Sequence, residues 1–359
     1  MSKILILPGD GIGKEVINEC LKIIDYFQAK VPIEITEDLF GGASIDKNGI
    51  PLTKDVLDKA LEADAVLLGA VGGPQWENLE HDLKPEKGLL TLRKELRAFA
   101  NLRPAKVFPA LINASTLKQE IVKGTDIFVV RELTGGIYFG EPRYNKKVEG
   151  KRVGANNLIY NEDEIERVAR VAFEIARKRN KKLTSLDKAN VLEEMQLWRD
   201  VVTEVHQKDF KDIELEHLYI DNAAMQVIKR PSTFDVILAG NLFGDIISDE
   251  VAELTGSLGM LPSASIGKDK AIYEPVHGSA PDIAGQNIAN PIAAILSLAM
   301  LYKYSLNLDN ISETIEKAVS KTLDDGIRTK DIGNKNTVTC TEMGDRILKN
   351  LAEIDSKEA

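Results

Sequence analysis

The sequence predicts an α/β fold, because short apolar runs alternate with longer amphipathic stretches along most of the chain. A short apolar run between turn signals is typical of a buried strand, and apolar residues three and four positions apart are typical of a helix. The length of 359 residues is enough for about two domains of the usual ~150 residues each. A large buried core is therefore expected.

In the first third of the chain, we predict strands at 4–7, 33–35 and 65–71 and helices at 14–27 and 53–63. The opening residues MSKILILPGD hold too short an apolar run for a secretory signal and are expected to form the first strand. We therefore expect a cytoplasmic protein.

The same alternation resumes in the middle of the chain. The predicted elements are the strands 126–133, 182–187, 214–220 and 234–240 and the helices 161–179 and 191–205. Between Tyr138 and Asn156 a polar, charged stretch breaks the pattern, which fits either a β-arm that leaves the core or an exposed mobile loop.

The last third is rich in Gly, Pro and Ser after Thr255, and we expect long loops there that carry function. The apolar stretch from Pro291 is shorter than the ~20 residues that span a bilayer and opens with proline, as helices often do. It is expected to form a buried core helix.

The charge and cysteine content exclude some classes of protein. The 46 Lys and Arg residues against 56 Asp and Glu residues give a net charge of −10, so general binding of nucleic acid or of an anionic membrane is not expected. Cys20 and Cys340 lie at opposite ends of the chain without metal-ligand spacing. Such sparse use fits a reducing compartment, and we expect two buried thiols.

The segment LPGDGIGKEV places glycines between a predicted strand and a helix, where phosphate groups often bind. A Walker A loop does not fit, because three residues separate Gly9 from Gly13 and Glu15 follows Lys14. The dinucleotide pattern G-x-G-x-x-G also fails, because Val16 stands at its last position. A tight turn without a ligand is the alternative.

A pair of carboxylates four residues apart points to a metal site. Asp245 and Asp249 in GNLFGDIISDE would project from one face of a predicted helix and grip a hard cation such as Mg²⁺ or Mn²⁺. An acidic first turn favoured by the helix dipole is the alternative. Asp221, after the strand 214–220, is a candidate third ligand.

Other chemistry-bearing residues stand at element ends. Lys188 follows the strand 182–187, at the sheet edge where α/β enzymes bind ligands, and becomes a base only if its amine can be neutral. Tyr138 lies in TGGIYFG. Arg93, Arg103 and Arg131 would clamp carboxylates if they converge. Each of these residues taken alone is more often structural or solvated.

Seven strings occur in order along the chain: LPGDGIGKEV, GGPQWENL, GLLTLRKELRAFANLRP, RELTGGIYFG, DKANVLE, GNLFGDIISDE and EPVHGSAPDIAGQNIANP. Together they resemble the motifs of the β-decarboxylating dehydrogenases, the isocitrate/isopropylmalate dehydrogenase family, nearly end to end. The resemblance implies a two-domain α/β fold with a central mixed sheet flanked by helices. That fold is unlike the G-x-G-x-x-G Rossmann fold, which explains the failed fingerprint.

The resemblance also implies domains and partners. A discontinuous cofactor-binding domain would comprise residues 1–98 and 256–359, and residues 99–255 would form the domain for substrate, metal and dimerisation. A homodimer is implied, in which Lys188 and Asp221 come from the partner subunit and an arm around 138–156 interlocks the subunits. The remaining partner is a small-molecule substrate, with no nucleic acid and no membrane.

Site residues follow from the resemblance in the same way. Lys188, Tyr138 and Asp221 would be catalytic, Arg93, Arg103, Arg131 and Asp221 would bind substrate, and Asp221, Asp245 and Asp249 would hold Mg²⁺ or Mn²⁺. Lys188 would take the proton of the 2-hydroxyl as hydride leaves C2 for NAD, and Tyr138 would protonate the enolate carbon after CO₂ departs.

The implied contacts to NAD are Ile12, Gly72, Gly73, Pro74, Trp76, Glu77, Glu86, Glu274, His277, Gly278, Ser279, Ala280, Asp282 and Asn290. Asp282 would accept hydrogen bonds from the ribose hydroxyls and repel the 2′-phosphate of NADP.

Three apolar residues suggest which hydroxy acid binds. Leu89, Leu90 and Val191 would suit an isopropyl group, and burying an unpaired carboxylate against them would cost several kcal/mol. The expected substrate is therefore a malate that bears an isopropyl group. D-Malate or tartrate remains the alternative within the family, and magnesium-dependent phosphoryl transfer or a non-catalytic scaffold the alternatives outside it.

Overall fold

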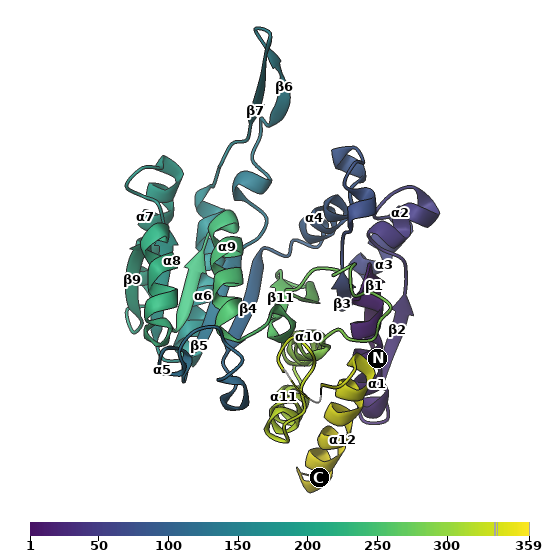
Figure 1. Ribbon diagram of the computed structural model, residues 1–359. Coiled ribbons are helices and arrows are strands. Elements are labelled where there is room, and N and C mark those ends of the chain that lie inside the picture. The colour runs from purple at the N-terminus through teal and green to yellow at the C-terminus, as the bar shows by residue number, and fades with distance from the viewer. Residues whose placement is uncertain (334, 336, 359) are drawn as a thin grey trace. The chain divides into compact units, whose positions relative to one another are not determined.

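The computed structural model describes residues 1–333, 335 and 337–358 and contains two compact units (Figure 1). The terminal unit comprises residues 1–98, 107–119 and 255–359, and the middle unit comprises 99–106 and 120–254. The segment 107–119, which the sequence placed in the middle domain, belongs to the terminal unit. There Arg328 Nη2 donates to the carbonyl oxygen of Ala110 at 2.7 Å, and the short helix η3 (Pro109–Leu111) packs against α11 (Asp309–Asp324).

The terminal unit holds a mixed sheet. Its strands, in spatial order, are β2 (Ile33–Glu37), β1 (Ser2–Gly9), β3 (Ala65–Ala70), β12 (Ala271–Pro275) and β11 (Pro262–Ile266). β1 pairs in parallel with β2 and β3, β12 pairs in parallel with β3, and β11 is antiparallel to β12. The last two strands correct the expectation of loops after Thr255. The small residues of β11 become strand through pairing, since all five of them have antiparallel partners in β12, from Pro262 opposite Pro275 to Ile266 opposite Ala271.

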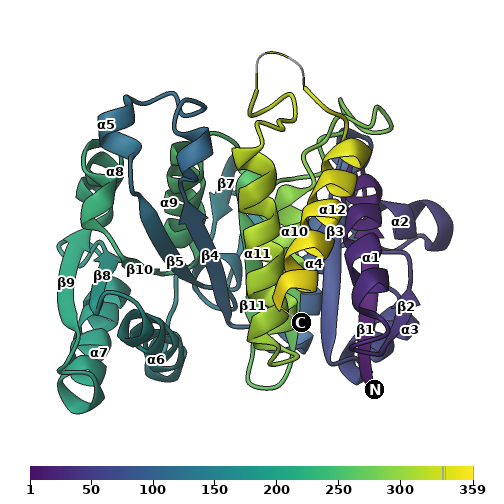
Figure 2. The ribbon, with the colours of Figure 1, turned by 90° about the horizontal axis from the view of Figure 1, so that it is seen from below.

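Helices cover both faces of that sheet. They are α1 (Gly13–Phe27), α2 (Gly42–Asn48), α3 (Lys54–Glu62), α4 (Pro85–Glu95), α10 (Ile292–Tyr304), α11 (Asp309–Asp324) and α12 (Cys340–Glu358), with short 3₁₀ turns η1 (Pro74–Trp76), η2 (His81–Leu83), η3 (Pro109–Leu111) and η6 (Leu258–Met260). α1, α10, α11 and α12 pack together (Figure 2), and the other face buries Leu5, Leu68 and Ile272 against α3 and α4. α10 is the predicted core helix, because nearly all of its residues are buried.

The middle unit is also a covered mixed sheet. Its strands, in spatial order, are β4 (Ala100–Lys106), β5 (Asp126–Glu132), β10 (Val236–Ala239), β8 (Lys182–Asp187) and β9 (Glu214–Tyr219). Only the β4–β5 pair among these is antiparallel. Its helices are α5 (Gln119–Val122), α6 (Glu162–Lys178), α7 (Glu193–Asp209), α8 (Ile220–Lys229) and α9 (Asn241–Leu254), with 3₁₀ turns η4 (Gly136–Tyr138) and η5 (Pro231–Thr233). α6 packs against α7, and α8 packs against α9.

The polar stretch after Tyr138 forms a two-stranded hairpin. β6 (Tyr144–Val148) pairs antiparallel with β7 (Lys151–Ala155), and Gly150 turns the chain at φ 78°. Most of its side chains are exposed, and the hairpin projects away from the sheet of the middle unit (Figure 1).

The structure also bears on the two cysteines and on the hydropathy of the helices. Cys20 and Cys340 are both buried thiols, as predicted, and burial raises the pKa of Cys340 to about 12. None of the helices that the structure describes is long and apolar enough to cross a membrane.

Candidate active site

The predicted polar residues of the middle unit gather at one edge of its sheet. β5, β10, β8 and β9 run parallel to one another, so their carboxyl ends lie on the same side. Arg131 is near the end of β5, Lys188 follows β8, and Asp221 is in the first turn of α8, directly after β9. This is the edge at which open α/β sheets bind ligands.

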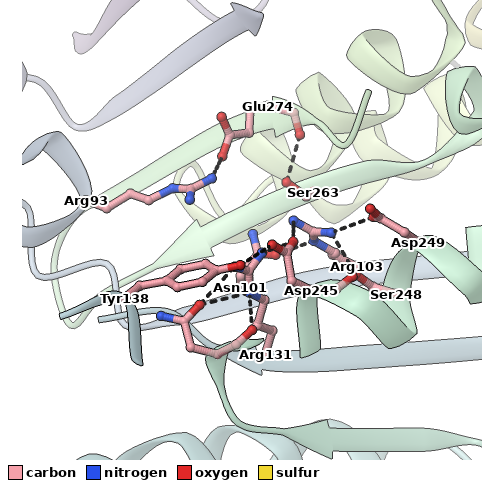
Figure 3. A network of polar contacts seen from close by, with 11 residues as sticks. Arg93, Asn101, Arg103, Arg131, Tyr138, Asp245, Ser248, Asp249, Ser263 and Glu274 are labelled. Atoms are coloured by element: carbon pink, nitrogen blue, oxygen red, sulfur yellow. Dashed lines mark hydrogen bonds and ion pairs between the residues drawn. The ribbon is translucent and has the colours of Figure 1, made fainter. Parts of the chain in front are cut away.

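Arg131, Tyr138 and Arg103 converge on the carboxylate of Asp245, and Arg103 also contacts Asp249 (Figure 3). Arg131 Nη1 lies 2.5 Å from Asp245 Oδ1, and the Tyr138 hydroxyl donates to Asp245 Oδ2 at 2.9 Å. Arg103 Nη2 lies 3.6 Å from Asp245 Oδ1, and Arg103 Nη1 lies 3.3 Å from Asp249 Oδ1. The five residues therefore form one cluster, which we call the Arg–Asp cluster.

Helix α9 explains why two aspartates reach this cluster. Asp245 and Asp249 are four residues apart within Asn241–Leu254, so both carboxylates lie on one face. Neither is in the first turn, which makes the helix-dipole alternative wrong. Their hard oxygen donors fit Mg²⁺ or Mn²⁺. Among the described residues, however, no three His, Cys, Asp or Glu side chains lie close enough to hold a metal ion.

Burial and charge set the protonation of the cluster. Burial raises the pKa of Tyr138 above its usual range and the neighbouring Asp245 carboxylate adds to the effect, whereas Arg131 and Arg103 oppose it. Tyr138 therefore carries its proton near neutral pH and can act as an acid. Burial also raises the pKa of Asp249.

Arg103 is supported by two residues that were not predicted from the sequence. Arg103 Nε donates to Asn101 Oδ1 at 2.6 Å, and Nη1 donates to Ser248 Oγ at 2.7 Å. Residues two apart on a strand share a face, so Asn101 lies on the same face as Arg103, and it pairs with Arg131 across the β4–β5 ladder. That period of two was a signal in the sequence that could have found Asn101.

Lys188 and Asp221 form a second group in the middle unit. Lys188 Nζ lies 2.8 Å from Asp221 Oδ1, and this hydrogen bond lowers the pKa of Asp221. Although α8 packs against α9, Asp221 does not come close enough to Asp245 and Asp249 to form a group of three metal-binding carboxylates among the described residues of one chain.

In the terminal unit, three loops that hold predicted cofactor contacts meet. Ile12 N donates to the Ser279 carbonyl oxygen at 2.8 Å, and Ser279 Oγ donates to the Gly72 carbonyl oxygen at 2.7 Å. Asp10, which the sequence analysis did not select, accepts the N–H of Gly72 at 2.8 Å and those of Gly42 and Ala43. A buried carboxylate thus fixes the glycine loop at 72–73.

His277 has one ring atom available for a ligand. Its Nδ1 contacts the Gly278 carbonyl oxygen at 2.9 Å, but the buried Nε2 has no hydrogen-bond partner among the described residues. Burial lowers the pKa of His277, so its ring is neutral near pH 7. A neutral ring nitrogen without a hydrogen-bond partner in the described part of the chain fits the predicted contact to an adenine base.

Other predicted cofactor residues are committed to the fold or lie at the surface. Trp76 is buried against Gly42 and donates from Nε1 to Asp46 at 3.0 Å. Asn290 accepts the N–H of Ile292 at 3.0 Å at the start of α10. Glu86 lies beside Gly72, and Ala280 has a φ of 39°. Gly73 is half-buried. The predicted cofactor residues that are exposed are Pro74, Glu77, Gly278 and Asp282.

Arg93 and Glu274 form an ion pair within the terminal unit (Figure 3). Arg93 is buried, and its Nε has no hydrogen-bond partner among the described residues. Of the three predicted apolar residues, Leu89 packs against the core of the terminal unit, Leu90 is half-buried and Val191 is exposed. Leu89 is therefore partly a core residue.

Comparison with known proteins places this geometry in a family. The model for isocitrate/isopropylmalate dehydrogenase matches residues 3–347. The chain is 57% identical to 3-isopropylmalate dehydrogenase of Aquifex aeolicus, with 98% of each chain covered, and 58% identical to that of Pelagibacter ubique, with 97% of this chain and 98% of the relative covered.

Solved structures agree. Isocitrate dehydrogenase from Methylococcus capsulatus matches with a TM-score of 0.88 at 32% identity, covering 98% of this chain and 99% of that one. A β-decarboxylating dehydrogenase from Thermococcus kodakarensis matches with a TM-score of 0.81 at 34% identity, covering 99% and 98%. The ordered motifs and the mixed-sheet fold thus have one explanation: this chain belongs to the isocitrate/isopropylmalate dehydrogenase family of enzymes.

Proposed function

We propose that this chain oxidises the 2-hydroxyl of (2R,3S)-3-isopropylmalate with NAD and releases CO₂ to give 4-methyl-2-oxopentanoate, a step of leucine biosynthesis. The observation that carries the proposal is the Arg–Asp cluster, in which two buried guanidinium groups, a protonated phenol and two carboxylates meet. Relatives named 3-isopropylmalate dehydrogenase, more than half identical over nearly the whole chain, support the choice of substrate.

Arg103 and Arg131 bind the carboxylates of the substrate. Both are buried with their guanidinium groups held by side chains or backbone of the middle unit, so little entropy is lost when an anion is clamped. Arg93 of the terminal unit is proposed to bind a substrate carboxylate as well, because its side chain is also buried.

Lys188 and Tyr138 move the protons. Lys188 is assigned to take the proton of the 2-hydroxyl, which requires its amine in the neutral form, and Asp221 Oδ1 at 2.8 Å fixes where that amine lies. Tyr138, whose pKa is raised by burial, delivers a proton to the carbon that loses CO₂. Because Tyr138 donates to Asp245 at 2.9 Å, its hydroxyl group is oriented before substrate arrives.

NAD and Mg²⁺ or Mn²⁺ are the proposed cofactors. When bound, the metal ion supplies a Lewis acid for the 2-oxygen and NAD accepts hydride. Asp245 and Asp249, with Asp221 of the partner subunit, would hold the ion, and the loops of Ile12, Gly72 and His277 would hold NAD. The exposed Asp282 carboxylate would favour NAD over NADP.

A homodimer in the cytoplasm is the proposed state of the protein. The separation of Lys188 and Asp221 from the Arg–Asp cluster, and the exposed β6–β7 hairpin as an arm, support a site completed by a second subunit.

The test is NADH absorbance after mixing purified protein with NAD, Mg²⁺ or Mn²⁺, and in turn 3-isopropylmalate, isocitrate, D-malate and tartrate. We expect metal-dependent turnover of 3-isopropylmalate, loss of turnover in Lys188→Ala, and slower turnover with NADP. Preference for D-malate or tartrate would overturn the substrate assignment, and full activity of Lys188→Ala would overturn its role as the base.

A further inference from the structure

We propose that Asn241 is a positioning residue that fixes Arg131 and the loop of Tyr138 relative to each other through a single side-chain amide. The proposal rests on the function proposed above, since it assigns Arg131 to substrate binding and Tyr138 to proton donation. Asn241 is the first residue of α9 and only 1% exposed, so it touches no substrate itself.

The oxygen atoms of Asn241 hold the guanidinium group of Arg131. Asn241 Oδ1 accepts from Arg131 Nη2 at 2.8 Å and from Nε at 3.2 Å, and the Asn241 carbonyl oxygen accepts from Nε at 2.9 Å. These bonds fix the plane of the guanidinium group and direct Nη1 toward Asp245, 2.5 Å away. One asparagine therefore determines which edge of Arg131 faces the Arg–Asp cluster.

The nitrogen of the same amide holds the loop that carries Tyr138. Asn241 Nδ2 donates to the carbonyl oxygen of Gly135 at 3.0 Å, and Gly135 immediately precedes η4 (Gly136–Tyr138). On the other side of this loop, buried Glu132 accepts the N–H groups of Thr134 at 2.9 Å and Gly135 at 2.8 Å. Gly135 is thus bound through both of its backbone polar groups.

Tyr160 fixes the backbone of Asn241. Its hydroxyl oxygen accepts the Asn241 N–H at 2.7 Å. Its ring lies against Gly135 and Gly136, where an added Cβ would come within 2.8 Å and 2.5 Å of ring or hydroxyl atoms. The network from Tyr160 through Asn241 to Arg131 and Gly135 is therefore continuous and buried.

Only an uncharged amide satisfies both partners. It offers an acceptor to Arg131 and a donor to Gly135 without adding charge. An aspartate would place one carboxylate oxygen against the Gly135 carbonyl oxygen and add a negative charge beside Arg131. An alanine would remove the Oδ1 acceptor of Arg131 Nη2 and the donor to the Gly135 carbonyl oxygen.

The test compares Asn241→Ala and Asn241→Asp with the unaltered enzyme, following NADH, CO₂ and 4-methyl-2-oxopentanoate separately. In both variants we expect the KM for 3-isopropylmalate to rise about tenfold or more and the KM for NAD to stay within about twofold. Formation of 4-methyl-2-oxopentanoate should also lag behind NADH and CO₂, because a misplaced Tyr138 slows protonation of the enolate after CO₂ has left. Asn180→Ala, an asparagine of the same unit bonded to Asp235, is the matched control for stability.

Each outcome decides the question. If the unaltered enzyme turns over no hydroxy acid, the proposed function fails. If it is active but Asn241→Ala keeps its KM and forms 4-methyl-2-oxopentanoate in step with NADH, the positioning role is wrong. Equal losses in kcat and in both KM values, together with a lowered melting temperature, would also reject it. Should Asn241→Ala not fold, Tyr160→Phe should show the same split to a smaller degree, because it removes the acceptor of the Asn241 N–H together with the hydrogen bond of the same hydroxyl group to Glu132.

Discussion

At the scale of single residues, the chemistry of the middle unit depends on polar groups that are buried and fully engaged. Arg131 is 3% exposed and Arg103 7%, and each is held by two or more partners. Buried polar groups of this kind are costly unless they are satisfied, so a change that removes one partner affects both the geometry of the site and the stability of the fold.

Gly244 provides the first prediction, because it lets α9 approach Arg131. A Cβ at this position would lie 2.6 Å from Arg131 Cγ, closer than real contacts allow. Gly244→Ala should therefore displace Arg131 and raise the KM for 3-isopropylmalate about tenfold or more, with little change for NAD. Steady-state kinetics would check this, with Gly154→Ala as control because its methyl group meets no atom within 4 Å. An unchanged KM would show that Arg131 tolerates the shift.

His217 provides a prediction on pH. Burial lowers its pKa below the ordinary 6.5, and the charge of Arg199 adds to this while Asp187 opposes it. The unfolded chain takes up this proton as pH falls through 6.5 but the folded chain does so only at lower pH, so the folded state loses stability as pH falls below 6.5.

His217→Gln should remove that part of the pH dependence. Urea unfolding midpoints at about pH 5 and about pH 8 would then differ less in the variant than in the unaltered protein. Equal differences in the two proteins would mean that the folded His217 titrates normally. The Thr203 hydroxyl group, 3.0 Å from His217 Nε2, is a partner that the glutamine amide can keep.

At the scale of elements, the local sequence best predicts where a helix begins and ends. α6 begins with a capping box, in which Asn161 Oδ1 accepts the Glu164 N–H and Glu164 accepts the Asn161 N–H, each at 3.0 Å. The signal N-x-x-E stands directly in the sequence, and the predicted helix 161–179 differs from α6 by one residue at each end.

Asn161→Ala should lower the free energy of unfolding by about 1 kcal/mol without changing kcat, because α6 loses its cap and lies outside the candidate site. Chemical denaturation would measure the loss. Asn161→Asp keeps an acceptor at the cap and should remain near the unaltered stability. A loss of activity in Asn161→Ala at full stability would contradict this purely structural role.

At the scale of the whole molecule, the prediction concerns sharing of sites between subunits. In the middle unit Arg131 is paired with Asp245, whereas Lys188 is paired with Asp221. If each active site takes Lys188 from the partner, a mixture of the inactive variants Arg131→Ala and Lys188→Ala should regain activity when subunits exchange.

Random exchange makes half of the dimers mixed, and each mixed dimer has one intact site, so about a quarter of the unaltered activity is expected. The measurement is NADH formation after refolding the two variants together, with each variant refolded alone as control. Absence of recovery, with mixed dimers demonstrated by a size or affinity tag, would place both residues in one subunit's site.

The amino-acid sequence by itself determined the α/β class, most helices and strands, the buried core helix after Pro291 and the identity of Arg131, Tyr138, Lys188 and Asp245 as candidates. These follow from local periodicity and from ordered motifs, which are properties of contiguous residues. The placement of Asp245 and Asp249 on one helix face needed only the helical period.

Only the tertiary structure decided the strands β11 and β12, the place of residues 107–119, and the supporting residues Asn101, Asn241 and Asp10. A small-residue segment becomes a strand when a neighbour pairs with it, which local propensity does not contain. A buried asparagine or aspartate acquires its role from partners far away in the chain, as Asn241 does from Arg131, 110 residues earlier. Such roles depend on long-range hydrogen bonds, and these exist only once the chain has folded.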